Sequence, residues 1–256
     1  MTNIAARWLP ERVRSILRFI LHPERFTYFG PPPSYCKDGL ATIHNADFTR
    51  DPSFSRAYAA SKAAGRWTGS WGAGDPEWRM FVACWAARHA CVLGQGDFVE
   101  CGVYRGGLAN TVMEYIGFRT MTNRLFWLLD TFDGVPPEQF AASDIHRHEY
   151  PDTYGEVLGL FAGYENVRIV RGAVPSTLSA VTSERIAFLS IDMNAAYPEL
   201  KAAEAFWDRL VPGAVMLLDD YGFDGHRSQK ESFDRFAASR NRQVLALPTG
   251  QGLILK

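Results

Sequence analysis

The sequence predicts an α/β fold: a Rossmann-like, mostly parallel sheet of seven strands with one antiparallel strand near its edge, helices on both faces, and a helical N-terminal extension. Two observations lead to this. Short apolar runs alternate with helical stretches from residue 97 onward, the pattern of a doubly wound sheet. The last two runs are separated only by residues 248–252, which is too short for a helical crossover, so that pair should be antiparallel.

Residues 1–74 are predicted to form the extension and residues 75–256 the main domain, because a chain of 256 residues favours one large domain with appendages. Residues 4–26 have apolar side chains at helical spacing and a net charge of +3. The simpler interpretation is an amphipathic helix that packs on its own domain. In the other interpretation, the helix lies on an anionic membrane or on a partner subunit. Arginines within its apolar part argue against a secretory leader. Residues 30–74, which contain three consecutive prolines at 31–33, predict an irregular connection with at most a short helix.

In the main domain, a helix is predicted over residues 77–93, because Trp78, Phe81, Val82 and Trp85 recur on one face and Asp75-Pro76 precedes them. The predicted strands are residues 98–101, 125–129, 167–170, 186–191, 214–218, 243–247 and 253–255. Residues 132–161 contain no strand pattern and predict an insertion over the strand ends, which is a common place for a lid or a substrate wall.

Composition excludes several classes of function. A net charge of -1 is unsuited to general nucleic-acid binding. Every apolar run is shorter than the roughly 20 residues that a membrane span needs. The 4 cysteines lack metal-ligand or CxxC spacing, so a reduced, cytoplasmic protein is expected.

The first predicted strand leads into a turn that contains Gly102, Gly106 and Gly107, followed by a helix. Glycines at a strand-to-helix turn let the backbone approach a ligand, and the helix N-terminus adds free N–H donors. The spacing is not the GxGxxG of dinucleotide binders. Glu100 before the turn would repel a phosphate but suits an amine.

The next two strand ends continue this pattern. Asp130 and Thr131 follow the second strand, where a carboxylate can accept hydrogen bonds from a ribose diol or can cap a helix. Gly172 and Ala173 follow the third strand and are small enough to lie beside a flat ring.

Three aspartates follow the fourth and fifth strands: Asp192, Asp219 and Asp220. Two carboxylates about 4 Å apart repel by about 4 kcal/mol at an effective dielectric near 20. A hard divalent cation such as Mg²⁺ offsets that repulsion directly. The alternative is that Asp192 or Asp219 caps a helix or pairs with an arginine such as Arg227.

These blocks resemble the class I S-adenosylmethionine-dependent methyltransferases of the macrocin O-methyltransferase type, which modify sugars of bacterial natural products. The resemblance covers residues 75–256 and rests on four motifs in order: DFVECGVYRGG at 97–107, LDTFDGVP at 129–136, LSID at 189–192 and PGA at 212–214 leading to LDDYG at 218–222.

The resemblance implies a role for each motif. The residues around the methionine part of S-adenosylmethionine would be Glu100, Gly102, Val103, Tyr104, Arg105, Gly106 and Gly107. Asp130, with Thr131 beside it, would take the ribose hydroxyls, and Gly172 and Ala173 would lie near the adenine. Asp192, Asp219 and Asp220 match the family's three metal-binding aspartates. Such a metal binds neighbouring hydroxyls of the acceptor and makes one of them more acidic.

The chain departs from the family at Asn194, where sugar-modifying members carry an aspartate taken as the general base. An amide cannot accept that proton. Three explanations stay open: a histidine (His226, His146 or His148) takes the proton, the metal alone makes the hydroxyl acidic enough, or the chemistry differs.

We therefore expect an O-methyltransferase, assisted by Mg²⁺, that acts on a hydroxyl of a sugar or diol-containing small molecule or glycan. One alternative is a non-catalytic S-adenosylmethionine-binding module, and a weaker one is a nucleotide-dependent oxidoreductase. The N-terminal extension could also cover a neighbour's site in a homo-oligomer. The residues that could line an acceptor pocket are Trp67, Trp71, Trp78, Tyr150, Tyr154 and Tyr197.

Overall fold

A computed structural model describes residues 32–63, 75–140, 150–223 and 225–256 of the chain. Residues 37–40 and 47–256 belong to one compact unit. Some of the sequence predictions fall outside the described residues. These are the helix over residues 4–26, the histidines His146 and His148, and the tryptophans Trp67 and Trp71.

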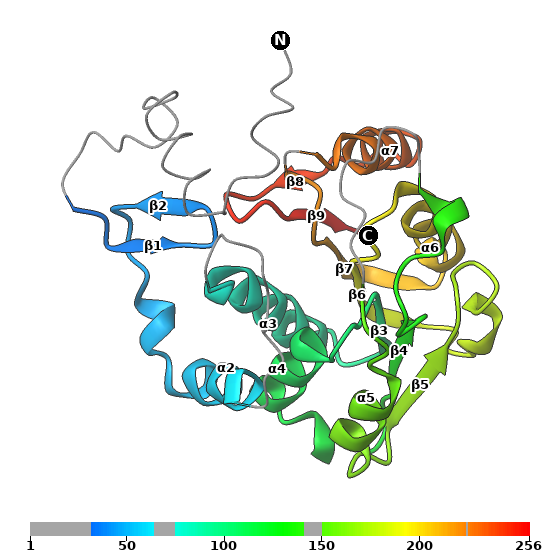
Figure 1. Cartoon of the computed structure of the whole chain (residues 1–256), viewed down its shortest axis with the longest axis horizontal. Coiled ribbons are helices and arrows are strands. Elements are labelled where there is room, and N and C mark those ends of the chain that lie inside the picture. The colour runs from blue at the N-terminus through cyan, green and yellow to red at the C-terminus, as the bar shows by residue number, and fades with distance from the viewer. Residues whose placement is uncertain (1–31, 64–74, 141–149, 224) are drawn as a thin grey trace. The chain divides into compact units, whose positions relative to one another are not determined.

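A seven-stranded sheet runs through this unit in the order β5-β4-β3-β6-β7-β9-β8 (Figure 1). Its strands are β3 (Asp97–Cys101), β4 (Phe126–Asp130), β5 (Val167–Arg171), β6 (Ile186–Ile191), β7 (Leu210–Leu218), β8 (Leu245–Ala246) and β9 (Gly252–Leu255). The first five pair in parallel, whereas β9 runs antiparallel to both β7 and β8. The predicted fold class, with one reversed strand near the edge, is confirmed.

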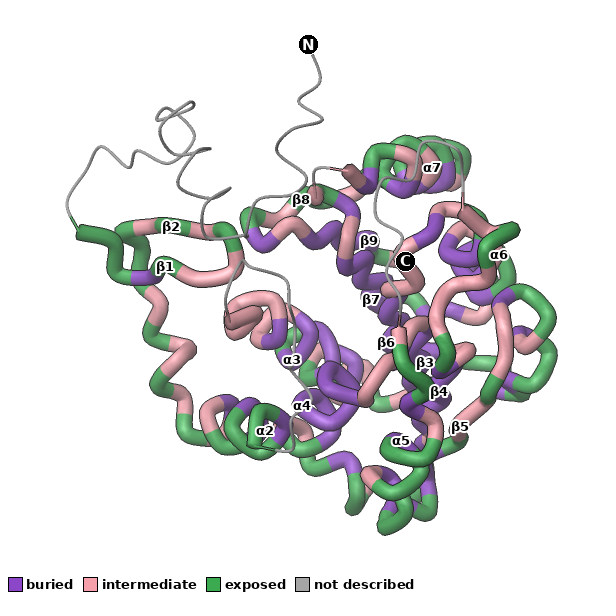
Figure 2. The backbone as a smooth tube through the Cα atoms, viewed as in Figure 1, coloured by how far each residue is buried: buried purple, intermediate pink, exposed green. Residues whose placement is uncertain are grey.

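The central strands are buried on both faces, as expected for a parallel sheet covered by helices (Figure 2). Every residue of β6 is buried, and Phe98, Phe126 and Phe188 of three adjacent strands pack their rings against one another. All three rings are fully buried, so they contribute to the core that holds these strands together.

Helices flank the sheet (Figure 1). On one side lie α3 (Glu77–Val92) and α4 (Gly107–Ile116), and on the other lie α6 (Ala196–Trp207) and α7 (Arg227–Ala238). The helix predicted over residues 77–93 is α3, which packs on β6, β7 and α4. Its buried positions include Met80, Cys84 and Ala87, at the spacing of one helical face.

The segment predicted to be irregular is more ordered than expected. It contains strands β1 (Tyr35–Lys37) and β2 (Leu40–Thr42), the short helix η3 (Asp47–Arg50) and the 12-residue helix α2 (Pro52–Ala63). Two local signals account for this. Asp38 and Gly39 have φ angles of 52° and 73°, as a two-residue hairpin turn requires. The Asp51 carboxylate accepts a hydrogen bond from the Phe54 N–H at 2.7 Å, which caps the helix that begins at Pro52.

The insertion over residues 132–161 also contains regular structure, namely the short helix η5 (Pro137–Gln139) and α5 (Tyr154–Phe161), which contacts β5. Buried Val157 and Phe161 are four residues apart, a helical signal that the sequence interpretation missed. The remaining elements are η4 (Phe118–Thr120) and η6 (Leu178–Ala180).

The order of the strands in the sheet places the carboxyl ends of β4, β3, β6 and β7 side by side. From β3 the chain moves outward to β4 and β5, then returns to the other side of β3 for β6 and β7. Ligands of open α/β sheets bind at such a reversal point, beyond the carboxyl ends of the strands. None of the described helices is both long and apolar enough to cross a membrane. All four cysteines are free.

Candidate functional site

The turn after β3 touches the loop after β6 directly. Gly102 has a φ of 92°, and a Cβ there would lie 1.6 Å from the Asp192 carbonyl oxygen. The Asp192 N–H donates to the Cys101 carbonyl at 2.8 Å. Only glycine allows this approach, so the glycine-rich turn and the first aspartate of the cluster form one continuous site.

The Asp130 carboxylate organises the glycine-rich turn. One of its oxygens accepts the Val103 and Tyr104 N–H groups at 2.5 and 2.7 Å, and the other accepts the Phe132 N–H at 2.6 Å. The Thr131 hydroxyl lies 3.2 Å from that second oxygen and donates to the Gly134 carbonyl at 2.6 Å. Gly172 donates its N–H to the Asp130 carbonyl at 2.8 Å. The structure therefore brings together three of the sequence-predicted groups: the first turn, Asp130 with Thr131, and Gly172 with Ala173.

Glu100 lies beneath the same turn and is 1% exposed. Its Oε2 has no hydrogen-bond partner among the described residues. Burial, reinforced by the charges of Asp130 and Asp219, raises the pKa of Glu100 well above its usual value. A buried carboxyl oxygen without a donor suits a ligand that brings N–H or O–H groups.

Asp192, Asp219 and Asp220 form the second half of the site. We call them the aspartate trio. One oxygen from each lies within 4.8 Å of the others. Burial and the neighbouring charges of Asp219 and Asp220 raise the pKa of Asp192 well above its usual value. Such mutual destabilisation of negative charge is what a divalent cation with oxygen ligands relieves, so the trio fits Mg²⁺.

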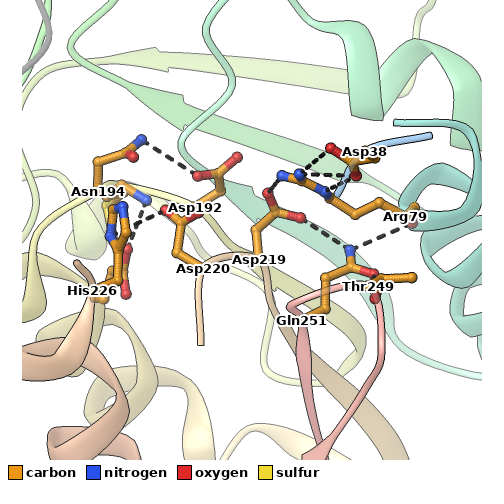
Figure 3. Close-up of polar contacts among 11 residues, drawn as sticks. Asp38, Arg79, Asp192, Asn194, Asp219, Asp220, His226, Thr249 and Gln251 are labelled. Atoms are coloured by element: carbon orange, nitrogen blue, oxygen red, sulfur yellow. Dashed lines mark hydrogen bonds and ion pairs between the residues drawn. The ribbon is translucent and has the colours of Figure 1, made fainter. Parts of the chain in front are cut away.

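Asp219 is held on both oxygens (Figure 3). The Arg79 guanidinium donates to Oδ2 and the Gln251 amide donates to Oδ1, each at 2.9 Å. The expected alternative of an arginine partner is thus realised for Asp219, but by Arg79 of α3. Arg227 pairs with Glu231 at 2.8 Å. Sequence analysis missed Arg79 and Gln251, because they lie 140 and 32 residues from Asp219.

Asn194 and His226 flank the opposite side of the trio (Figure 3). Asn194 has a φ of 56°, and its Nδ2 lies 3.5 Å from the nearer Asp192 oxygen. Asn194 Oδ1 is buried with no partner among the described residues. His226 Nδ1 lies 2.6 Å from Gln229 Oε1 and 3.7 Å from Asp220 Oδ2.

A buried glutamate that the sequence analysis did not select supports this side of the site. Glu199 of α6 accepts hydrogen bonds from the Met193 N–H and the Gln229 amide, each at 3.0 Å. Burial, followed by the charge of Asp220, raises the pKa of Glu199 to about 8. The sequence feature that could have identified Glu199 is its position in the first turn of the helix that follows Asp192 and Asn194.

The predicted pocket aromatics have different environments. Trp78 packs on Phe48 with ring centroids 4.8 Å apart. Tyr150 packs edge-on against Tyr104 at 5.2 Å, and burial together with the charges of Asp192 and Asp220 raises the pKa of its hydroxyl. Tyr197 lines a cavity of about 400 Å³.

This cavity lies between the η5 region, α6 and α7. Its lining residues are Glu138, Gln139, Phe140, Ala196, Tyr197, Leu200, Ser228, Glu231, Ser232 and Arg235.

Comparison with known proteins decides the family. The family described as "Macrocin-O-methyltransferase (TylF)" matches residues 92–244 of this chain. That stretch contains the glycine-rich turn, Asp130 and the aspartate trio. The chain belongs to the macrocin-O-methyltransferase family. The resemblance inferred from the sequence motifs is thereby confirmed.

Curated relatives of this macrocin-O-methyltransferase family member include two sugar-named O-methyltransferases from Streptomyces and Micromonospora. One is the 8-demethyl-8-(2,3-dimethoxy-alpha-L-rhamnosyl)-tetracenomycin-C 4'-O-methyltransferase of Streptomyces olivaceus, 28% identical over 52% of this chain and 55% of the relative. Another is the mycinamicin III 3''-O-methyltransferase of Micromonospora griseorubida, 26% identical over 49% of this chain and 55% of the relative. The chain thus spans about half the length of these relatives.

Among solved structures, the O-methyltransferase NovP matches with a TM-score of 0.61 at 20% identity, over 72% of this chain and 81% of that one. That likeness supports the fold of this family member.

Proposed function

We propose that the chain is an S-adenosylmethionine-dependent O-methyltransferase, assisted by Mg²⁺, that methylates a hydroxyl of a sugar or diol-containing metabolite. The observation that carries the proposal is the packing of the glycine-rich turn against the aspartate trio through Gly102 and Asp192. A methyl donor on one side and an acceptor hydroxyl on the other would then be adjacent, as direct in-line transfer requires.

On the cofactor side, Glu100 would accept hydrogen bonds from the amino group of the methionine part, because its Oε2 is buried and lacks a donor. The turn from Gly102 to Gly107 would surround that part, with Gly172 and Ala173 near the adenine. The Thr131 hydroxyl donates its one hydrogen to the Gly134 carbonyl at 2.6 Å, so one lone pair of Asp130 Oδ1 would accept a ribose hydroxyl. The bonds that Asp130 accepts from Val103 and Tyr104 would keep the turn in shape before the cofactor binds.

On the acceptor side, Asp192, Asp219 and Asp220 would hold the cation. When bound, Mg²⁺ would supply Lewis-acid polarisation that lowers the pKa of an acceptor hydroxyl. Asn194 cannot take the hydroxyl proton, but its buried Oδ1 can accept a hydrogen bond from a neighbouring acceptor hydroxyl. His226 lies beside the trio, and its Nδ1 must carry a hydrogen because it faces the Gln229 amide oxygen. We assign its other ring nitrogen, Nε2, as the proton acceptor.

The acceptor class rests on the relatives and on the cavity of about 400 Å³. The two relatives above are named for 4'- and 3''-O-methylation, and the first name specifies a rhamnosyl group. The cavity begins at Ala196 and Ser228, each two residues beyond Asn194 and His226. Its aromatic, acidic and basic side chains suit a glycosylated acceptor that extends away from the reacting hydroxyl.

The test is methyl transfer from radiolabelled S-adenosylmethionine to a panel of rhamnosylated polyketides, nucleotide-linked deoxysugars and simple catechols, in Mg²⁺ or in EDTA. We expect labelled product with a sugar acceptor in Mg²⁺ and its loss in EDTA. Cofactor binding without labelling of any acceptor would favour the non-catalytic binding module instead.

We also propose that the N-terminal extension contributes to a homo-oligomer. Phe54 and Tyr58 of α2 belong to the hydrophobic core, so a truncation that tests this should end before residue 32. Light scattering should show an oligomer for the full chain and a smaller particle for the truncated chain. The proposal would be rejected if both chains had the mass of a monomer.

A further inference from the structure

Arg79 and Gln251 form a structured support behind Asp219 that lies apart from the ligand-facing groups of the site. Together with Asp38 and Thr249 they make a chain of side chains that we call the Asp219 support (Figure 3). Its members come from the β1–β2 turn, helix α3 and the loop before β9. Arg79 and Gln251 contact Asp219 directly, whereas Asp38 holds Arg79 and Thr249 holds Gln251.

Arg79 is divided between two aspartates. Its Nη1 donates to Asp219 at 2.9 Å, while Nε and Nη2 form a fork on Asp38 with distances of 2.9 to 3.1 Å. The side chains of Arg79, Asp38 and Asp219 are only 16%, 8% and 6% exposed. Although burial disfavours the guanidinium charge, Asp219 and Asp38 raise the pKa of Arg79, so the pair bonds are charge-assisted.

Gln251 completes the support from the other side. It is fully buried, and its amide donates to Asp219 Oδ1 at 2.9 Å. Its own carbonyl accepts the Thr249 hydroxyl at 2.9 Å, which fixes the amide orientation. A backbone hydrogen bond also joins the loop after β7 to the loop before β9, because the Gly222 N–H donates to the Gly250 carbonyl at 2.6 Å.

We propose that Arg79 and Gln251 are positioning residues for the cation site, and that Asp38 holds the Arg79 fork in place. With one donor fixed on each oxygen, the Asp219 carboxylate is held in one orientation, with an oxygen within 4.8 Å of an oxygen of Asp192 and of Asp220. Asp38 keeps part of the guanidinium charge away from the trio, so the trio retains enough negative charge to bind a dication. This inference rests on the proposed function, because it presumes that the trio binds a cation.

Two substitutions test positioning without changing the net charge. R79K keeps the cation but loses the planar fork, and Q251L removes one donor from Asp219. The readout is Mn²⁺ affinity, measured by electron paramagnetic resonance on the cofactor-free protein. We expect each variant to bind Mn²⁺ about tenfold more weakly than wild type, the usual loss when a partner of a metal ligand is removed. D38N should weaken binding in the same direction, because it leaves the Arg79 charge entirely on Asp219.

R88K is the matched control. Arg88 is on the same helix, donates to the Tyr115 carbonyl and lies over an aromatic ring, as Arg79 lies over Phe223. Its variant should bind Mn²⁺ as wild type does. S-adenosylhomocysteine affinity should be unchanged in all four variants, which shows that the fold and the cofactor half are intact.

Mn²⁺ affinities of R79K and Q251L within about twofold of wild type would overturn the positioning role. Parallel losses of Mn²⁺ and S-adenosylhomocysteine binding would also overturn it, because they indicate general misfolding. If wild type itself binds no Mn²⁺, both the cation site and this inference fall, whereas tight binding by wild type and by every variant removes the inference alone.

Discussion

The two halves of the site are built in different ways. Around the glycine-rich turn, Asp130 is satisfied largely by backbone N–H groups from its own loop and the preceding turn. Around the trio, Asp219 is satisfied by side chains from α3 and from the loop before β9. Two short motifs, 97–107 and 129–136, can therefore encode the first half almost alone, whereas the second half depends on side chains from α3 and from the loop before β9.

The halves meet at Gly102, so the largest effect should follow from Gly102→Ala. Its Cβ would overlap the Asp192 carbonyl at 1.6 Å, and the φ of 92° disfavours any side chain. We expect the unfolding free energy to fall by at least about 3 kcal/mol and both ligands to be lost. Chemical denaturation and ligand titration measure the two effects.

Gly117→Ala is the control for this prediction. Gly117 has a φ of 67°, but a Cβ there meets nothing within 4 Å. It should cost only about 1 kcal/mol through backbone strain, with ligand binding retained. Equal losses in the two variants would mean that the contact with Asp192 is not what joins the halves.

The second effect separates the halves. Asp130→Ala leaves the Val103, Tyr104 and Phe132 N–H groups without their acceptor, so we expect at least tenfold weaker S-adenosylhomocysteine binding and about 2 kcal/mol lower stability. Asp219→Ala should do the reverse, with Mn²⁺ binding lost and cofactor affinity kept. Calorimetry on both variants checks this, and identical losses of both ligands would contradict the division.

A smaller gain should follow from Asn194→Asp. A fourth carboxylate beside Asp192 should raise Mn²⁺ affinity by about tenfold. If a proton acceptor at this position is what the chain lacks, methyl transfer to a diol should also rise, by about tenfold or more. Single-turnover assays over a pH range test this, with Asn194→Ala as the control. Unchanged turnover together with tighter cation binding would assign Asn194 a different task.

A further effect concerns the pH dependence of stability. Because the pKa of Glu199 is raised from 4.5 to about 8, the folded protein keeps a proton that the unfolded chain has lost. Its contribution to stability is fully present below about pH 4.5 and is lost as pH rises toward 8. Glu199→Gln in EDTA should therefore show a shallower decline of unfolding free energy between pH 5 and 8. An unchanged slope would mean that Glu199 ionises normally.

The same contrast explains what could be predicted from the sequence. The strands along the chain, the reversed strand and the trio follow from apolar periodicity, from the short final connection and from carboxylates placed just after strands, so they needed no tertiary information. Arg79 and Gln251 carried no local signal, since an arginine within an amphipathic helix is ordinarily a solvated face. Helix α2 had a signal in the Asp51 cap and in Phe54, Ala57 and Tyr58, but the nearby prolines and glycines outweighed it.

The central claim is that one half binds S-adenosylmethionine and the adjoining half binds a divalent cation. Calorimetric titration of the full chain with S-adenosylmethionine and S-adenosylhomocysteine, each with and without Mg²⁺, tests it most directly. We expect micromolar binding of both compounds, and a separate Mg²⁺ heat that disappears in Asp219→Ala. Absence of cofactor binding under either condition would contradict the methyltransferase assignment and leave only the fold.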